Sequence, residues 1–137
     1  MTPDALAALH ARCFTMPRPW SAAEFTTLLA SKGVFLQSTA AGFALGREIT
    51  GESELLTLAV DPALQRQGHG RQLLAAFEAE SRKRSATEAL LEVAATNTGA
   101  CSLYKNAGYT ESGRRPRYYS PPQGAKIDAI LMRKSLI

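Results

Sequence analysis

Two glycines and two arginines follow an apolar stretch near the middle of the chain, in a pattern that can bind an anion. Residues 58–72 read Leu-Ala-Val-Asp-Pro-Ala-Leu-Gln-Arg-Gln-Gly-His-Gly-Arg-Gln. Gly68 and Gly70 permit a tight turn with inward-facing N–H groups, and a helix that begins there adds the positive end of its dipole. Arg66 and Arg71 can add charge-assisted hydrogen bonds to the same anion. The pattern predicts a phosphate cradle; the alternative is that the glycines form only a tight connection.

The spacing of this loop excludes the two common nucleotide-binding motifs. It matches neither G-x-x-x-x-G-K-[ST] nor G-x-G-x-x-G. We therefore expect neither a P-loop triphosphate nor a Rossmann dinucleotide as the ligand.

Glu92 is a carboxylate within the apolar segment Leu90-Leu-Glu-Val-Ala94. This segment is predicted to be a strand between two helices, so both faces of the sheet would normally be covered and apolar. Two interpretations fit. Glu92 lies on a solvated face or in an ion pair, or it stands at the edge of a cleft as a functional carboxylate.

Tyr104 is the second residue whose chemistry stands out. It belongs to an apolar stripe at helical spacing that also contains Ala100, Leu103 and Ala107. The stripe predicts that the ring packs, while a buried hydroxyl needs a partner. On its own, Tyr104 indicates a core residue more strongly than a catalyst.

The composition indicates one globular domain over residues 1–137. Of these residues 45% are hydrophobic and 20% are charged, which is typical of a soluble protein with a packed core. The net charge of +4 favours anionic ligands, but the chain lacks the dense basic stripe of a nucleic-acid binder, and we expect no direct nucleic-acid partner. Cys13 and Cys101 lack metal-ligand spacing, so we expect no metal and two buried free thiols.

The chain begins without a basic region followed by an apolar run, and none of its apolar stretches is long enough to span a bilayer. We therefore expect a cytoplasmic protein that does not associate with membranes. A monomer is the expected state.

The first predicted helix begins at the N-terminus. Thr2 and Pro3 fit the cap and first position of a helix that reaches about Cys13. His10 lies off the apolar stripe of this helix, which predicts a solvated surface residue.

A second helix follows a break at residues 16–19, where two prolines disfavour helix. Ser21 and Glu24 form a capping box, and the helix is predicted to end near Gly33. Trp20 precedes the cap. It either packs as a hydrophobic staple or lines the mouth of a site between the two helices.

The remaining chain alternates between strands and helices without repeats or linkers. The predicted order is strands at 34–38, 42–48 and 54–60, a helix at about 69–84, a strand at 89–95, a short helix at about 99–107, a strand at 109–113, a Pro-rich loop, and a last strand at 126–133.

Together, these segments resemble the GNAT superfamily of acetyl-CoA-dependent N-acetyltransferases. The acetyl-CoA loop of that family is Q/R-x-x-G-x-G/A, and residues 65–70 satisfy it. The resemblance also rests on Val60-Asp-Pro, Leu91-Glu-Val, Asn97 and Leu103-Tyr-Lys-Asn-Ala-Gly-Tyr109. Three further segments are similar to one branch, the bacterial ribosomal-protein-alanine N-acetyltransferases: Pro19-Trp-Ser21, Gly113-Arg-Arg-Pro-Arg-Tyr-Tyr119 and Asp128-Ala-Ile-Leu-Met132.

The resemblance implies an α/β fold with a mixed, mostly antiparallel sheet flanked by helices. Two parallel strands, 58–60 and 91–95, should splay apart and leave a V-shaped opening. The implied cofactor is acetyl-CoA. The resemblance assigns its pantetheine arm to Leu58, Ala59, Val60 and Asn97, and its pyrophosphate to Arg66, Gln67, Gly68, His69, Gly70 and Arg71.

The resemblance also implies roles in catalysis. Glu92 is implied as the base that takes a proton from the acceptor amine, directly or through water. Tyr104 is implied as the acid for the leaving thiolate and contacts the cofactor. Transfer is direct, in a ternary complex, and Cys101 is not expected to carry the acyl group.

The implied acceptor is the α-amino group of an N-terminal alanine on a small-subunit ribosomal protein. Trp20, Tyr118 and Tyr119 are the expected lining of the peptide site, between residues 16–21 and a loop at 114–123. Arg114, Arg115 and Arg117 in that loop have either a role there or only a solvated one. Two alternatives remain open: a GNAT enzyme that acetylates a small-molecule amine or a lysine side chain, and a non-catalytic module that binds acyl-CoA.

Overall fold

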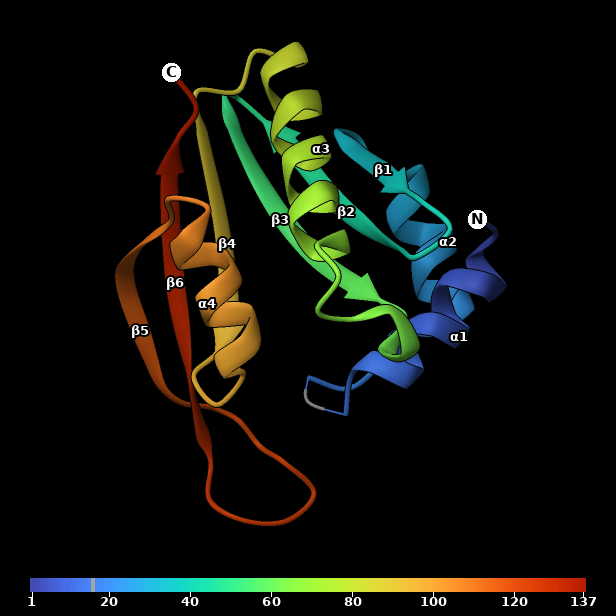
Figure 1. The fold of residues 1–137 in the computed structure, drawn as a ribbon, viewed down its shortest axis with the longest axis vertical. Helices are drawn as coiled ribbons and strands as arrows, with labels where there is room; N and C mark the ends of the chain where they lie inside the picture. Colours follow the sequence, from blue (N-terminus) through green and yellow to red (C-terminus); the bar gives the residue numbers. More distant parts are fainter. Residues whose placement is uncertain (16) are drawn as a thin grey trace.

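The computed structural model describes residues 1–15 and 17–137, and its elements follow the predicted order (Figure 1). Met16, in the predicted break at residues 16–19, lies outside the described residues. The elements are α1 (Pro3–Cys13), α2 (Ala22–Ala30), β1 (Val34–Ser38), β2 (Gly42–Ile49), β3 (Glu52–Val60), a short 3-10 helix (Pro62–Leu64), α3 (His69–Lys83), β4 (Glu88–Ala94), α4 (Thr98–Asn106), β5 (Thr110–Tyr119) and β6 (Ile127–Ser135).

The strands form a mixed sheet in the order β1-β2-β3-β4-β6-β5, in which only β3 and β4 run parallel. Their pairing extends from Glu52 opposite Glu88 to Leu55 opposite Leu91 and ends there. Both strands continue further, and Figure 1 shows them parting from one end of the molecule to the other. The predicted V-shaped opening between two parallel strands is therefore confirmed.

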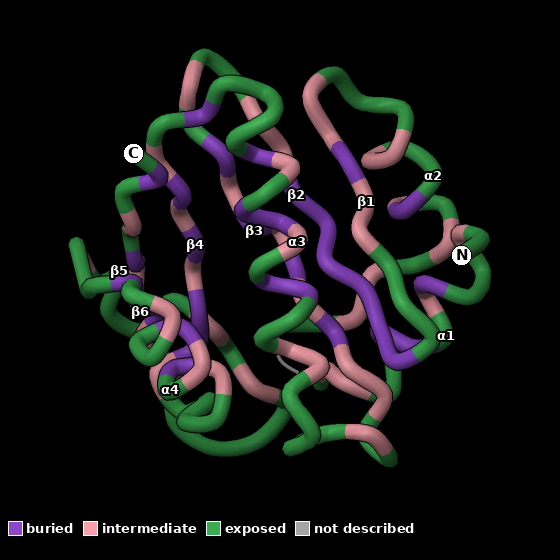
Figure 2. Tube along the Cα trace, turned by 45° about the horizontal axis from the view of Figure 1, so that its top comes forward, coloured by how far each residue is buried: buried purple, intermediate pink, exposed green. Residues whose placement is uncertain are grey.

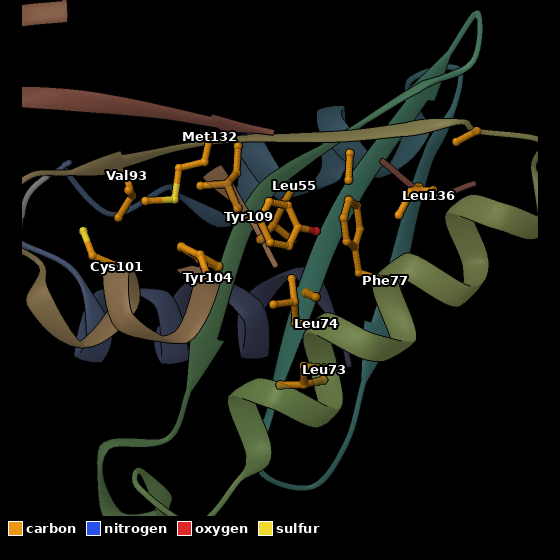
Figure 3. Packing of buried hydrophobic residues seen from close by; sticks show 14 of the residues in the cluster. Leu55, Leu73, Leu74, Phe77, Val93, Cys101, Tyr104, Tyr109, Met132 and Leu136 are labelled. Atoms are coloured by element: carbon orange, nitrogen blue, oxygen red, sulfur yellow. The ribbon is translucent and has the colours of Figure 1, made fainter. Parts of the chain in front are cut away.

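Helices pack on both faces of the sheet, and each face has its own apolar core. Side chains alternate along β2: Ala44 belongs to the cluster beneath α3 and α4, whereas Phe43 and Leu45 belong to the cluster beneath α1 and α2. Figure 2 shows the buried segments along β2, β3 and β4 and on the inner sides of the helices. Figure 3 shows the α3–α4 cluster, in which Leu73, Leu74 and Phe77 lie on one face of α3, as the spacing predicted.

The first two helices begin at the predicted caps. Thr2 Oγ1 accepts a hydrogen bond from the Ala5 N–H at 3.1 Å. Ser21 and Glu24 form the complete capping box, with each side chain accepting a hydrogen bond from the other residue's N–H. Because these caps satisfy N–H groups at the helix starts, they fix where each helix begins.

A β-bulge on β3 reverses the direction of its side chains. Leu45 of β2 lies opposite Thr57 and Gly46 lies opposite Leu55, so Leu56 is an extra residue. Before the bulge, Leu55 packs beneath α3 and α4. After it, Leu58 packs on that face and Thr57 turns toward α1. The bulge lies where β3 parts from β4.

β5 is longer than predicted, because it includes residues 114–119 that were assigned to a loop. Pro116 is tolerated there because β5 is an edge strand that pairs only with β6. A register shift between Arg115 and Tyr119, with a positive φ of 54° at Arg117, interrupts the ladder without ending the strand. Among the described residues, no helix is long and apolar enough to cross a membrane.

Candidate active site

The predicted phosphate loop leads into α3 with a backbone suited to an anion. Gly68 is the N-cap of α3, with a φ of 85° and no side-chain cap, so the first N–H groups of the helix are left for another partner. A Cβ on Gly70 would lie 3.2 Å from the Leu103 side chain of α4. Each position therefore requires glycine for a physical reason. Gly68 adopts a left-handed backbone conformation, and Gly70 allows α3 and α4 to approach closely.

A cavity of about 440 Å³ lies beside this loop, between α3, the end of β3 and the start of α4. Among the described residues, Arg66 and Arg71 take part in no ion pair, although they lie on its rim. Their charges are available to a ligand. The lining consists of Cys13, Phe14, Leu58, Val60, Leu64, Gln65, Arg66, Gly68, His69, Gly70, Arg71, Asn97, Gly99, Ala100 and Leu103.

The last part of β3 offers this cavity a backbone edge that pairs with no strand, although the Val60 carbonyl already accepts hydrogen bonds from the Cys13 thiol and the Gln65 side-chain amide. From Leu58 to Val60 the strand pairs with β2 on one side, while its pairing with β4 has already ended. Leu58 and Val60 line the cavity, and Ala59 is buried on the opposite face. Since backbone N–H and C=O groups need partners, this edge can bind an extended ligand that carries amides.

Asn97 stands where α4 begins. Its Oδ1 accepts a hydrogen bond from the Ala100 N–H at 3.2 Å and so caps the helix. The residue also lines the cavity beside the loop and a second cavity. Asn97 is therefore the N-cap of α4, and its side-chain NH₂ group, which donates to no described residue, can donate to a ligand.

The second cavity, of about 710 Å³, brings together most of the predicted catalytic and acceptor residues. It shares Phe14, Leu58, Asn97 and Ala100 with the first cavity, so the two adjoin where the strands part. Its walls come from β3, β4, β5, α1 and α4, and include His10, Trp20, Thr57, Glu92, Tyr104, Tyr118 and Tyr119.

Glu92 is ion-paired, as one interpretation of the sequence expected, and it also lines a cavity, which is the position that the other interpretation required. Its carboxylate forms an ion pair with Arg115, with 2.9 Å between Oε1 and Nε, and its side chain is 26% exposed. It also lines the second cavity. The carboxylate is ion-paired and accessible from the cavity, so it can accept a proton from a bound amine.

Tyr104 is buried, and its ring packs in the core with Cys101 on the same helix (Figure 3). No hydrogen bond of its hydroxyl occurs among the described residues. Since no fully buried side-chain oxygen there lacks a partner, the hydroxyl is accessible from the second cavity, which the residue lines. Burial raises the pKa of Tyr104, with a further contribution from Cys101. A phenol that stays protonated and unpaired beside a cavity can donate a proton or hydrogen bond to a ligand.

The prediction that both cysteines are buried is confirmed for Cys101 and wrong for Cys13. Cys101 is buried, and its Sγ faces the Ala94 carbonyl at 3.9 Å. Cys13 is only half-buried, because it ends α1 at the rim of the first cavity and its Sγ donates to the Val60 carbonyl at 3.2 Å. Both thiols are free.

Tyr118 and Tyr119 lie on β5 and line the second cavity, with 5.2 Å between their ring centres. Arg115 lies over the Tyr118 ring at 5.3 Å. Burial raises the pKa of Tyr119 to about 12, and the nearby Glu92 carboxylate adds to this shift. Arg115 thus connects the predicted base with the predicted acceptor wall.

The other two arginines of this segment are held away from the cavity. Arg114 pairs with Glu111 and Asp128, and the Arg117 N–H donates to Asp128 at 3.0 Å. Both residues are exposed, as in the solvated alternative, but they belong to β5 and not to a loop, because Asp128 of β6 secures the irregular part of the strand.

The prediction that His10 is a solvated surface residue is also wrong. His10 is 1% exposed and packs among Phe14, Trp20, Phe25 and Phe43. It lies four residues after Leu6 and four before Phe14, and this spacing should have placed it on the inner face. Its polar nitrogens are both satisfied inside the fold.

Trp20 has both of the roles that the sequence left open. Its ring packs edge-on against Phe25, the fourth residue of α2, as in a hydrophobic staple. It also lines the second cavity.

Thr57 is a site residue that sequence reasoning missed, and the contact of Arg115 with Glu92 was not predicted. Thr57 is a polar residue inside an apolar strand, the same signal that identified Glu92. The pairing of Arg115 with Glu92 joins residues 23 positions apart across two strand pairings, and local spacing carries no sign of it.

Known proteins match both the sequence and this architecture. The sequence pattern of the Acetyltransferase (GNAT) family matches residues 4–109. The chain therefore belongs to the GNAT acetyltransferase family and is an acetyl-transferring enzyme. This confirms the family that the loop, Glu92 and Tyr104 indicated together.

Two curated relatives extend the comparison. The [ribosomal protein bS18]-alanine N-acetyltransferase of Escherichia coli K12 is 36% identical over 135 residues, which cover 96% of this chain and 90% of the relative. The N-alpha-acetyltransferase RimI of Mycobacterium tuberculosis is 37% identical over 137 residues, with 93% and 83% covered.

A crystal structure of the ribosomal-protein-S18-alanine N-acetyltransferase from Escherichia coli matches the fold with a TM-score of 0.85. It is 31% identical to this chain, and the match covers 98% of this chain and 87% of that protein.

Proposed function

We propose that this enzyme transfers the acetyl group of acetyl-CoA to the α-amino group of a protein N-terminus, namely the N-terminal alanine of a ribosomal protein of the S18 type. One observation carries the chemistry: two cavities adjoin at the parting of β3 and β4, with Glu92 and Tyr104 in the wall of the second. The acceptor follows from similarity over 96% of the chain to an enzyme with that activity.

The first cavity fits acetyl-CoA. The N–H groups of Arg66, Gln67, Gly68, His69, Gly70 and Arg71 would hold the pyrophosphate, which suits the uncapped start of α3. The free edge from Leu58 to Val60 would bind the amides of the pantetheine arm, with Asn97 on the opposite side. When bound, acetyl-CoA supplies an acetyl group activated as a thioester.

Glu92 and Tyr104 supply the proton transfers. An amine is protonated at neutral pH and cannot attack until it loses a proton, and Glu92 would accept that proton from the second cavity. Tyr104 would donate to the leaving sulfur, because its hydroxyl is protonated and has no partner among the described residues.

The acceptor peptide would enter through the second cavity, against Trp20, Tyr118 and Tyr119. These rings come from two segments on either side of the opening, the α1–α2 connection and β5. We propose a monomer that acts in the cytoplasm on a ribosomal protein.

Mass spectrometry of peptides incubated with enzyme and acetyl-CoA tests this function. The set contains an Ala-starting peptide, a Ser-starting peptide, and an N-terminally blocked peptide with one lysine. Acetylation of the Ala-starting α-amine alone, or much faster than the others, is the expected result. Faster acetylation of the lysine peptide would contradict the proposed acceptor, and tight CoA binding without any turnover would favour a non-catalytic module.

A further inference from the structure

His10 links two walls of the acceptor cavity, the second and larger of the two. Its Nδ1 accepts a hydrogen bond from the Trp20 backbone N–H at 3.0 Å, and its Nε2 lies 3.0 Å from Thr57 Oγ1. The ring also stacks on Trp20, with 5.0 Å between centres. The buried imidazole therefore links β3 to the segment between α1 and α2.

These contacts fix the tautomer of His10. A backbone N–H can only donate, so Nδ1 must carry a lone pair and no proton. The neutral ring then carries its proton on Nε2 and donates it to Thr57 Oγ1. No other arrangement of a neutral imidazole satisfies both contacts.

The tautomer in turn determines what the Thr57 hydroxyl can do. Its oxygen already accepts a hydrogen bond from His10, so its own proton must point elsewhere. No hydrogen bond among the described residues uses that proton, and Thr57 lines the acceptor cavity. The hydroxyl is thus a donor without an acceptor, in a wall that a substrate would contact.

The position of Thr57 indicates which substrate it faces. The bulge at Leu56 turns Thr57 toward α1, whereas Leu58 packs on the opposite face and lines both cavities. Thr57 lines only the acceptor cavity. Glu92 on β4 lies in the other wall of that cavity, so an amine next to Glu92 brings the rest of its residue toward β3.

We propose that the Thr57 hydroxyl, oriented by His10, donates a hydrogen bond to the first carbonyl oxygen of the acceptor peptide, the carbonyl of the residue that carries the reacting amine. This inference rests on the proposed function, because it requires a peptide acceptor. Thr57 is then a binding residue for the acceptor, and His10 is a positioning residue that acts through it.

A substrate pair tests the contact directly. One peptide starts with alanine; the other replaces its first peptide bond with an (E)-alkene, which keeps the extended shape but lacks the carbonyl oxygen. With the native enzyme, the alkene should show a KM roughly tenfold higher, the factor expected when a buried donor loses its partner. Thr57→Val should raise the KM of the Ala-starting peptide by a similar factor. The same substitution should change the KM of the alkene peptide little.

Three further variants separate this contact from general damage to the fold. Thr57→Ser keeps the hydroxyl and should restore the low KM. His10→Gln keeps a donor near the Nε2 position and should retain the difference between the peptides, whereas His10→Asn keeps only the Nδ1-like acceptor and should reduce it. The KM for acetyl-CoA should stay within about twofold in all four variants.

The outcomes are distinct. Equal effects of Thr57→Val on both peptides would overturn the inference while leaving the proposed function intact. A fall in kcat with an unchanged peptide KM would also overturn it, because the hydroxyl would then contact the thioester carbonyl. If the native enzyme acetylates neither peptide, the proposed function fails, and this inference fails with it. If Thr57→Val does not fold, the His10 variants make the same test: the KM difference between the two peptides should be smaller in His10→Asn than in His10→Gln.

Discussion

Arg115 and Glu92 join two strands that are not neighbours: Arg115 Nε on β5 lies 2.9 Å from Glu92 Oε1 on β4, across the intervening β6. The same guanidinium lies over the ring of Tyr118 at 5.3 Å. The proposed base and the proposed acceptor wall are thus held by one side chain.

Arg115→Gln should lower transfer more than it lowers stability. The arginine is 55% exposed and its partner 26% exposed, so the ion pair contributes no more than about 1 kcal/mol to folding. Freeing Glu92 and Tyr118 should reduce kcat/KM for the peptide several-fold. Arg114→Gln is the matched control, because its partners Glu111 and Asp128 do not line the acceptor cavity. Equal kinetic losses in the two variants would contradict a specific role for Arg115.

Glu92→Gln should slow acetylation by about 10²–10⁴-fold, the usual contribution of a general base. The KM or Kd for acetyl-CoA should be unchanged, since Glu92 does not line the cavity beside the loop. Steady-state kinetics and calorimetric titration of CoA measure the two effects separately. Raising the pH should recover part of the rate, because more of the amine is then already neutral. A variant with full activity at neutral pH would remove Glu92 from the mechanism.

Tyr104→Phe and Tyr109→Phe should separate catalysis from stability. The Tyr104 hydroxyl has no partner among the described residues, so its removal should leave the free energy of unfolding nearly unchanged and slow transfer at least tenfold. The Tyr109 hydroxyl donates to the buried Glu78 at 3.0 Å, so its removal should cost about 1–3 kcal/mol and leave transfer unchanged in the folded enzyme. Denaturant unfolding and initial rates on both variants test the contrast; a reversed order would contradict both assignments.

Local spacing was enough to predict the element order and the glycine turn before α3, whereas the catalytic roles proposed for Glu92 and Tyr104 came from the family resemblance. The caps at Thr2 and Ser21 and the glycines of the loop work within a few residues of chain, and their patterns carry that information. The burial of His10 was missed although its spacing from Leu6 and Phe14 indicated it. What local spacing does not show is that Thr57 and Trp20, 47 and 10 residues away, satisfy its two nitrogens.

The extension of β5 was missed because the contacts that make it a strand come from distant residues. Pro116 and the arginines around it read as a loop, and only pairing with β6 and the hydrogen bond to Asp128 make the segment a strand. The secondary structure of such a segment depends on its tertiary contacts, and these contacts leave no pattern of fixed spacing in the sequence.

Gly68→Ala should weaken acetyl-CoA binding rather than folding alone. The added methyl group meets no atom within 4 Å, but the residue has a φ of 85°, where a side chain costs about 1–2 kcal/mol. The loop can relieve this strain by turning its N–H groups away from the ligand, which should raise the KM for acetyl-CoA about tenfold. Gly124→Ala is the control: its φ is 92°, its methyl group is equally free, and it lines neither cavity. Both variants should lose similar stability, and a similar loss of acetyl-CoA binding in both would contradict the role of the loop.

The stability of the enzyme should fall as the pH drops from about 6.5 toward 4.5, because of His10. Burial lowers the pKa of His10 to about 4 in the folded protein, while an unfolded histidine titrates near 6.5. Between these values the unfolded chain binds a proton that the folded chain does not, so stability rises with pH in this window. At pH 5 the loss is at most about 2 kcal/mol.

Between pH 4.5 and 6.5 the effect of His10 on stability is separate from that of the carboxylates whose pKa is shifted. Arg18 beside Glu24 lowers the pKa of that carboxyl to about 2, and hydrogen bonding at the Ala63 N–H lowers that of Asp61, so both affect stability only below pH 4.5. His10→Gln should flatten the slope between pH 6.5 and 4.5, since the amide keeps the contact with Thr57 and cannot titrate. Urea unfolding of both proteins at intervals of half a pH unit measures the difference. Parallel curves would show that another group is responsible for the pH dependence.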